Sequence, residues 1–207
     1  MESLFKVLLV IHIGSGSIAL LSGTWVLLRP KGDKTHRRNG KLFHLAMVVN
    51  GISALTMSVL HPNYLLFVIG IFSLYLAESG RRMVARENQS GTIATKIITG
   101  IMMLTAFIFI GDGMYKWVSG NNFGIVLTVF GSIALFLVRQ DIRIFRLSNP
   151  EYHQRLNAHI GKMTGSFISA STAFLVVNNT LLPGVIAWLL PTILLVPVII
   201  YWTRKQA

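Results

Sequence analysis

The chain has 207 residues, of which 53% are hydrophobic and only 13% are charged, and it contains no cysteine. A soluble domain carries about 25% charged residues, so this composition argues against a soluble globule, and the missing cysteines exclude disulfides, thiolate metal sites and thiol catalysis. The net charge of +12 fits either nucleic acid or a membrane as partner. The long apolar segments indicate an integral membrane protein.

Seven segments of the chain are apolar enough to cross a bilayer, whose hydrocarbon core of about 30 Å requires roughly 20 residues per helix. In chain order they are 3–29, 42–60, 64–78, 92–111, 123–139, 159–178 and 183–202. The third is the weakest, because its apolar run is short and reaches a full crossing only with Glu78. The first lacks a small-residue cleavage site and is interpreted as a helix of the mature protein. We therefore expect an all-α polytopic membrane bundle of about seven transmembrane helices, forming one transmembrane domain over 1–207.

The distribution of basic residues predicts the orientation of this bundle. All Lys and Arg except Lys6 and Lys116 lie between the first and second spans, the third and fourth, the fifth and sixth, or at the C-terminal end. Cytoplasmic loops carry such an excess. The pattern predicts a bacterial inner-membrane protein with its N-terminus outside and its C-terminus in the cytoplasm. It also favours the lipid bilayer over nucleic acid as the partner of the basic clusters.

Two parts of the chain resemble each other. The sequence Gly-Ser-Ile-Ala-Leu occurs at 16–20 and again at 131–135, and a Gly-Lys pair and a proline follow each copy at similar offsets. Parallel repeats of this kind occur in transporters. The pattern suggests a 3+1+3 arrangement with repeats 1–80 and 121–203 and a connecting helix at 92–111, although five matched residues in apolar sequence also arise by chance.

Ionisable groups inside a membrane are costly and count as candidates for a functional site. The candidates lie at two depths, because about 17 residues, or roughly 25 Å of helix, separate His12 from Arg29 at the basic side. On the first span, His12, Gly16, Ala19 and Gly23 share one helical face. Small residues on this face let helices approach closely, so we expect His12 to point into the bundle.

Nearer the basic side, His44 and His159 each begin a span at similar depth. Two imidazoles that face each other from adjacent helices can hold a six-coordinate haem iron. The sequence therefore predicts haem b binding by His44 and His159, with His12 as a ligand to a second cofactor. The same region suits a divalent transition metal, since His36, His159 and Glu78 form a set of nitrogen and oxygen donors that zinc accepts.

The residues also carry a family resemblance. The series His12-Ile13-x-x-Gly16-x-x-Ala19-Leu20-x-x-Gly23, then Lys31-Gly32, then His36-Arg37-x-x-Gly40-Lys41-x-Phe43-x-x-x-Met47 resembles an uncharacterised family of bacterial predicted membrane proteins with a domain of unknown function. His159-Ile160-Gly161-Lys162-Met163 is similar to the later signature of that family. The resemblance implies a multi-spanning inner-membrane protein, singles out His12, His36, Arg37 and His159, and supplies no activity.

We expect a membrane protein that binds haem or a transition metal through histidines, with a redox role and an unidentified redox partner. A small-solute transporter or channel is the first alternative, supported by the repeat and by Asn50 and Ser171 in corresponding spans. A zinc-dependent membrane hydrolase near Glu78 is the second. The sequence leaves open whether the chain forms a homo-oligomer and whether it is an enzyme.

Overall fold

The computed structural model describes residues 2–85, 91–147 and 149–205, and in this part of the chain every regular element is an α-helix. The helices are α1 (Glu2–Leu28), α2 (Lys34–Leu60), α3 (Tyr64–Met83), α4 (Ile93–Val118), α5 (Phe123–Arg146), α6 (Tyr152–Val177) and α7 (Gly184–Lys205). Among the described residues, six of them are long and apolar enough to cross a membrane, and α3 is the exception. The expected polytopic helical bundle is confirmed. The segment 64–78, predicted to be the weakest span, corresponds to α3.

Several helices extend beyond the apolar segments that predicted them. Helix α2 begins at Lys34, where the side chain of Asp33 accepts a hydrogen bond of 2.6 Å from the backbone N–H of His36. Helix α6 begins at Tyr152, after a capping box formed at Glu151. Hydropathy marks the part of a helix that lies in lipid, whereas capping groups mark where the helix itself begins.

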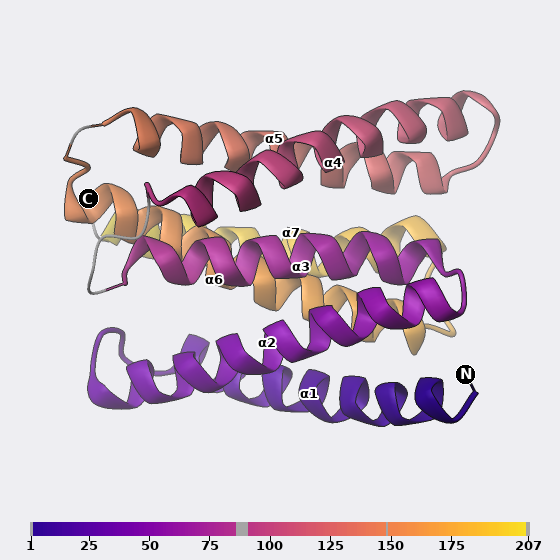
Figure 1. Cartoon of the computed structure of the whole chain (residues 1–207), viewed down its shortest axis with the longest axis horizontal. Helices are drawn as coiled ribbons and strands as arrows, with labels where there is room; N and C mark the ends of the chain where they lie inside the picture. Colours follow the sequence, from indigo (N-terminus) through magenta and orange to yellow (C-terminus); the bar gives the residue numbers. More distant parts are fainter. Residues whose placement is uncertain (1, 86–90, 148, 206–207) are drawn as a thin grey trace.

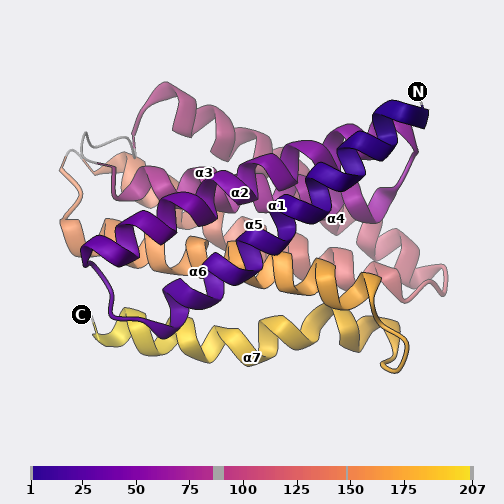
Figure 2. The same cartoon turned by 90° about the horizontal axis from the view of Figure 1, so that it is seen from below.

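The helices form three groups (Figure 1). Helices α1 and α2 pack together at one side, α4 and α5 pack together at the other, and α3 and α6 lie between them with α7 against α6. Figure 2 shows α7 along one edge of the bundle. The N- and C-termini lie at opposite ends (Figure 1). We call the end that holds the connections after α1, α3 and α5 and the end of α7 the basic end.

The main hydrophobic core lies where the middle group meets the α4–α5 pair. The ring of Phe72 on α3 lies 5.2 Å from that of Phe130 on α5, which lies 5.7 Å from the ring of Trp188 on α7. All three side chains are buried. Aromatic contacts of this kind add packing energy in lipid, where no hydrophobic effect drives helices together.

Glycines allow α4 and α5 to approach closely. A Cβ atom on Gly131 would lie 2.9 Å from the carbonyl oxygen of Ala106, and one on Gly124 would lie 2.3 Å from that of Gly113. Both distances are too short for a side-chain carbon. The α4–α5 pair is therefore an example of helix packing through small residues.

Lys31 closes the C-terminal end of α1 in the loop at the basic end. Its Nζ donates hydrogen bonds to the carbonyl oxygens of Val26 (2.7 Å) and Leu27 (2.8 Å), which have no partner within the helix. The same Nζ lies 4.6 Å from the ring centre of Trp202 on α7. Partial burial lowers the pKa of Lys31 from its usual value.

The two proposed repeats have different surroundings. Helix α1 packs mainly on α2, whereas its counterpart α5 packs mainly on α4 and contacts α6 only slightly. The repeat, with its boundaries 1–80 and 121–203, stays a prediction.

Candidate functional site

His12 lies on α1 against α2, as the sequence predicted. Its Nδ1 donates to the backbone oxygen of Asn50 at 3.1 Å and lies 3.1 Å from Ser53 Oγ. The side-chain amide of Asn50 donates back to the carbonyl oxygen of His12 at 2.8 Å. Gly16 leaves the space for this amide, because a Cβ there would lie 3.0 Å from Asn50 Nδ2. These two hydrogen bonds between His12 and Asn50 join α1 to α2, and the first of them satisfies Nδ1 of His12.

His44 is paired with Glu78. The Nε2 atom of His44 on α2 lies 3.0 Å from Glu78 Oε1 on α3. The other carboxylate oxygen accepts a hydrogen bond of 3.4 Å from Nε of Arg82, one turn further along α3. The structure therefore brings together two of the predicted site residues, but as partners of each other.

His159 is held by the backbone of α3. Its Nδ1 donates to the carbonyl oxygen of Gly80 at 2.9 Å. In the described part of the chain, no hydrogen bond involves its Nε2. When Nδ1 carries the proton, Nε2 presents a lone pair, which is the form of imidazole that binds a metal.

His36 lies on the first turn of α2. The charge of its ring interacts with that of the His159 ring on α6. The His36 Nδ1 is buried, and among the described residues it has no hydrogen-bond partner. An unsatisfied buried nitrogen calls for an explanation. Two histidines from α2 and α6 thus each have a ring nitrogen without a protein partner.

The surroundings of this pair contain two open glycines. Gly40 lies one turn after His36, and Gly161 lies two residues after His159. No atom would lie within 4 Å of a Cβ placed on either glycine. We call His36, His159, Gly40 and Gly161 the α2–α6 histidine site.

The structure does not assemble the larger metal-ligand set that the sequence suggested. Within residues 2–85, 91–147 and 149–205, no three His, Asp or Glu side chains form a group that could hold a metal ion. Glu78 lies with His44 rather than in a cluster with His36 and His159. The other two histidines, His61 and His153, are exposed and pair with Glu2 and Glu151, respectively.

Sequence reasoning missed an ion pair at the centre of the bundle. Lys162 of α6 donates to Asp141 Oδ1, and both side chains are 0% exposed. The second oxygen, Oδ2, accepts hydrogen bonds from Tyr75 on α3 (2.8 Å) and Thr99 on α4 (3.1 Å). Lys162 also donates to Ser79 on α3. One polar network therefore joins four helices.

In the sequence, neither residue of this pair stands out as a site residue. Asp141 follows the apolar segment 123–139 and lies among arginines, and Lys162 lies close to the start of the next segment. The structure places both residues inside helices, since α5 continues to Arg146 and α6 begins at Tyr152. The capping residue Glu151 is the signal that places Lys162 well inside a helix.

Residues 9–109 match the family described as predicted membrane protein (DUF2306). No curated protein and no solved structure matches the chain. The match contains the residues from His12 to Met47 that carry the resemblance and ends before His159. Residues 9–109 are therefore similar to this family of predicted membrane proteins of unknown function.

Proposed function

We propose that the chain binds haem b, or a single transition-metal ion, at the α2–α6 histidine site and that it has a redox role in the membrane. The observation that supports this proposal is that one imidazole on α2 and one on α6 each have a ring nitrogen that no described residue uses, and that the charges of the two rings interact. An ionisable side chain in a membrane bundle needs a partner. An iron or other metal ion would supply it for both rings at once.

The hydrogen bond from His159 to Gly80 fits this role. Histidines that bind a metal almost always donate their other ring N–H to a carboxylate, a carbonyl or water. The bond of 2.9 Å to the Gly80 carbonyl fixes the orientation of the His159 ring and directs Nε2 away from α3. Because the partner is a backbone group of a neighbouring helix, the ring is held before any ligand arrives.

Haem suits this donor set better than a bare zinc ion. A structural zinc takes four protein ligands and a catalytic zinc takes three, whereas the described residues offer no group of three. Two axial imidazoles complete the coordination of a haem iron. No neighbouring atom would lie within 4 Å of a Cβ on Gly40 or Gly161, so these two positions are not filled by packed side chains. A bound haem would supply one-electron transfer, and the protein would tune it through the two imidazoles and the exclusion of water.

His44 and His12 have different positions in this proposal. Nε2 of His44 already has Glu78 as its partner, so we propose that His44 supports α2 beside the site instead of binding the iron. The Asn50 backbone fixes the ring of His12, and His12 stays a predicted ligand for a second cofactor at the opposite end. The zinc hydrolase alternative has less support, because His44 and Arg82 occupy both oxygens of Glu78.

The absorption spectrum of the purified protein tests the proposal. The protein should be expressed with added haem precursor, extracted in mild detergent, and measured for a Soret band, haem content and bound metals. We expect about one haem per chain, or one metal ion if haem is absent. His159→Ala and His36→Ala should each remove most of it, because a bis-imidazole site loses its geometry with either ligand.

Two matched variants serve as controls. His153→Ala and His61→Ala remove exposed histidines that pair with glutamates outside the α2–α6 histidine site, and both should keep the full cofactor content. A wild-type protein that carries neither haem nor any stoichiometric iron, copper or zinc would overturn the proposal. Equal loss of cofactor in the control variants would do so as well.

A second candidate function is transport of protons or a small polar solute, favoured by the Asp141–Lys162 network. Buried charges in membrane bundles often mark ion pathways and proton relays. Beside this network on α6, Ser166 Oγ and Thr172 Oγ1 are buried and have no hydrogen-bond partner among the described residues. Asn50 has less support as a transport residue, because it is engaged with His12.

Proteoliposomes loaded with a pH-sensitive dye test this second candidate. Imposed pH gradients should collapse faster with the wild-type protein than with the double variant Asp141→Asn/Lys162→Met. Asp112→Asn is the matched control, since Asp112 pairs with Lys116 near the opposite end of the bundle. Equal proton flux in wild-type, double-variant and empty vesicles would rule out proton transport.

We also propose that the basic end faces the cytoplasm of a bacterial inner membrane, which places the N-terminus outside. The support is the clustering of nearly all Lys and Arg at one end of the bundle, as expected from the excess of positive charge in cytoplasmic loops.

A further inference from the structure

A hollow of about 360 Å³ lies between α4 and α5 towards the basic end. Its lining is of two kinds. Met103 of α4 and Leu135 and Ile142 of α5 supply apolar surface, and Arg139, Arg143 and Arg146 of α5 supply positive charge. The volume lies within the range of about 300–1,000 Å³ that is typical of small-molecule sites.

The three arginines form one charged stripe. They are spaced four and three residues apart, so they lie on one face of α5. All three are exposed. Among the described residues, none of their guanidinium groups takes part in a hydrogen bond or an ion pair. Guanidinium groups bind phosphate through paired hydrogen bonds, and here three of them are available side by side.

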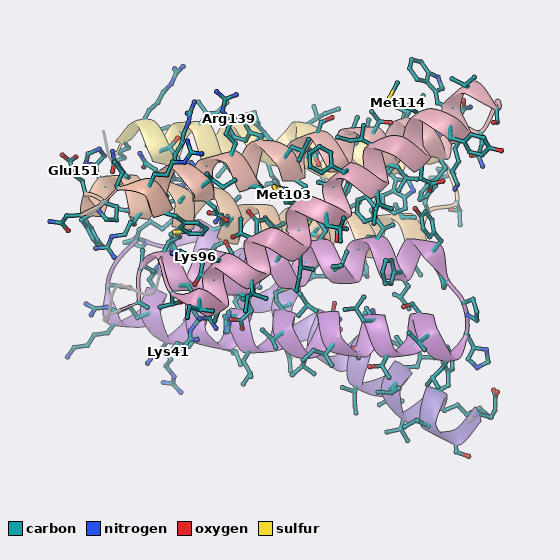
Figure 3. The ribbon with its side chains drawn as sticks, turned by 45° about the horizontal axis from the view of Figure 1, so that its top comes forward. Lys41, Lys96, Met103, Met114, Arg139 and Glu151 are labelled. Atoms are coloured by element: carbon teal, nitrogen blue, oxygen red, sulfur yellow. The ribbon has the colours of Figure 1, made fainter. Side chains whose placement is uncertain are left out.

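Part of the apolar lining, supplied by Leu135, lies deeper along α5 than the arginines, whereas Ile142 lies at their level. Helix α5 runs from Phe123 at the opposite end to Arg146 at the basic end, so Leu135 is further from the basic end than the charged stripe. Figure 3 shows the same order, with Arg139 nearer to Glu151 than Met103 is, and Met114 farther from Glu151 than either. The charge therefore lies at the level of the membrane surface, and the apolar lining extends towards the bilayer centre.

We propose that this hollow binds one anionic phospholipid, with its phosphate against Arg139, Arg143 and Arg146 and the upper part of an acyl chain against Met103 and Leu135. Basic pockets between membrane helices bind acidic lipid head groups. A free phosphate would satisfy the arginines but leave the apolar lining without a partner. An amphiphile with a negative head is the one class of molecule that matches both parts. This inference is independent of any cofactor at the α2–α6 histidine site.

Lipid binding to the purified wild-type protein tests the proposal. Native mass spectrometry in mild detergent should be used to titrate phosphatidylglycerol and phosphatidylcholine, with glycerol phosphate as the probe for the head group alone. We expect tight binding of one phosphatidylglycerol and weak binding of the other two. The triple variant Arg139→Gln/Arg143→Gln/Arg146→Gln should lose affinity on the order of a hundredfold, because each arginine near an anionic head group contributes to binding.

The control is a triple variant with the same change in charge at other positions of the basic end. Lys41→Gln/Arg81→Gln/Arg204→Gln removes three exposed charges that do not line the hollow and should keep the one-lipid stoichiometry and most of the affinity. Leu135→Asn tests the apolar part and should weaken phosphatidylglycerol but leave glycerol phosphate unchanged. Equal binding of both lipids, or equal loss in the two triple variants, would overturn the proposal.

Discussion

Asp141 on α5 and Lys162 on α6 form an ion pair in which neither side chain has any exposed surface. The pair connects the α4–α5 group to the middle of the bundle, because Asp141 also accepts hydrogen bonds from Tyr75 and Thr99. A buried pair of opposite charges is neutral as a unit. The loss of one partner leaves the other as an unpaired charge in a medium without water.

Removing one charge of this pair should therefore cost more stability than removing both. Asp141→Leu and Lys162→Met should each destabilise the protein by about 3–5 kcal/mol, because each leaves one buried charge without its partner. The double variant Asp141→Leu/Lys162→Met should be more stable than either single one. Thermal unfolding in detergent, monitored by intrinsic fluorescence, measures this double-mutant cycle. Additive losses in the double variant would mean that the two charges do not interact.

The contact between His12 and Asn50 should hold α1 against α2. Asn50→Ala removes the amide that donates to the His12 carbonyl and should reduce stability by about 0.5–1.5 kcal/mol, because a hydrogen bond between two helices is lost. His12→Ala should have an effect of similar size, and the double variant should lose less than the sum. Ser17→Ala removes an exposed bond within α1 and is the control. A change in melting temperature as large as that of Asn50→Ala in this control would contradict the assignment.

The close approach of α4 and α5 should not tolerate a side chain at Gly131. Gly131→Val places atoms where the Ala106 carbonyl lies 2.9 Å from the Cβ position, so the two helices must separate and lose packing. We expect a loss of about 1–3 kcal/mol and a lower yield of monodisperse protein on size-exclusion chromatography. Gly111→Ala on α4 has no atom within 4 Å of the new Cβ and should behave like the wild type. Normal stability of Gly131→Val would show that the helices are further apart than described.

The proposed orientation predicts the behaviour of reporter fusions in bacteria. A fluorescent protein that folds only in the cytoplasm should be bright when it is fused after Ala207. Alkaline phosphatase, which is active only outside the cytoplasm, should be active when it is inserted between Asn121 and Asn122 in the turn before α5. The opposite pattern would reverse the topology. As an internal control, phosphatase inserted beside Asp33 in the loop after α1 should be inactive, because this loop lies at the basic end.

The sequence alone determined the class of this protein and the number of its helices. Apolar segments must form helices in a bilayer, since every backbone polar group there needs a partner within the chain. For the same reason, the short third segment could be recognised as the weakest. The first signature, from His12 to Met47, also led to the family that residues 9–109 match.

The tertiary structure decided which of the singled-out residues meet. Hydropathy could not show that His44 faces Glu78, or that His159 meets the carbonyl of Gly80, because these contacts depend on the rotation of one helix against another. It also could not reveal Asp141 and Lys162 as partners. In the sequence each is one more charge near a basic loop, and only the packing of α5 and α6 removes both from water and makes their pairing necessary.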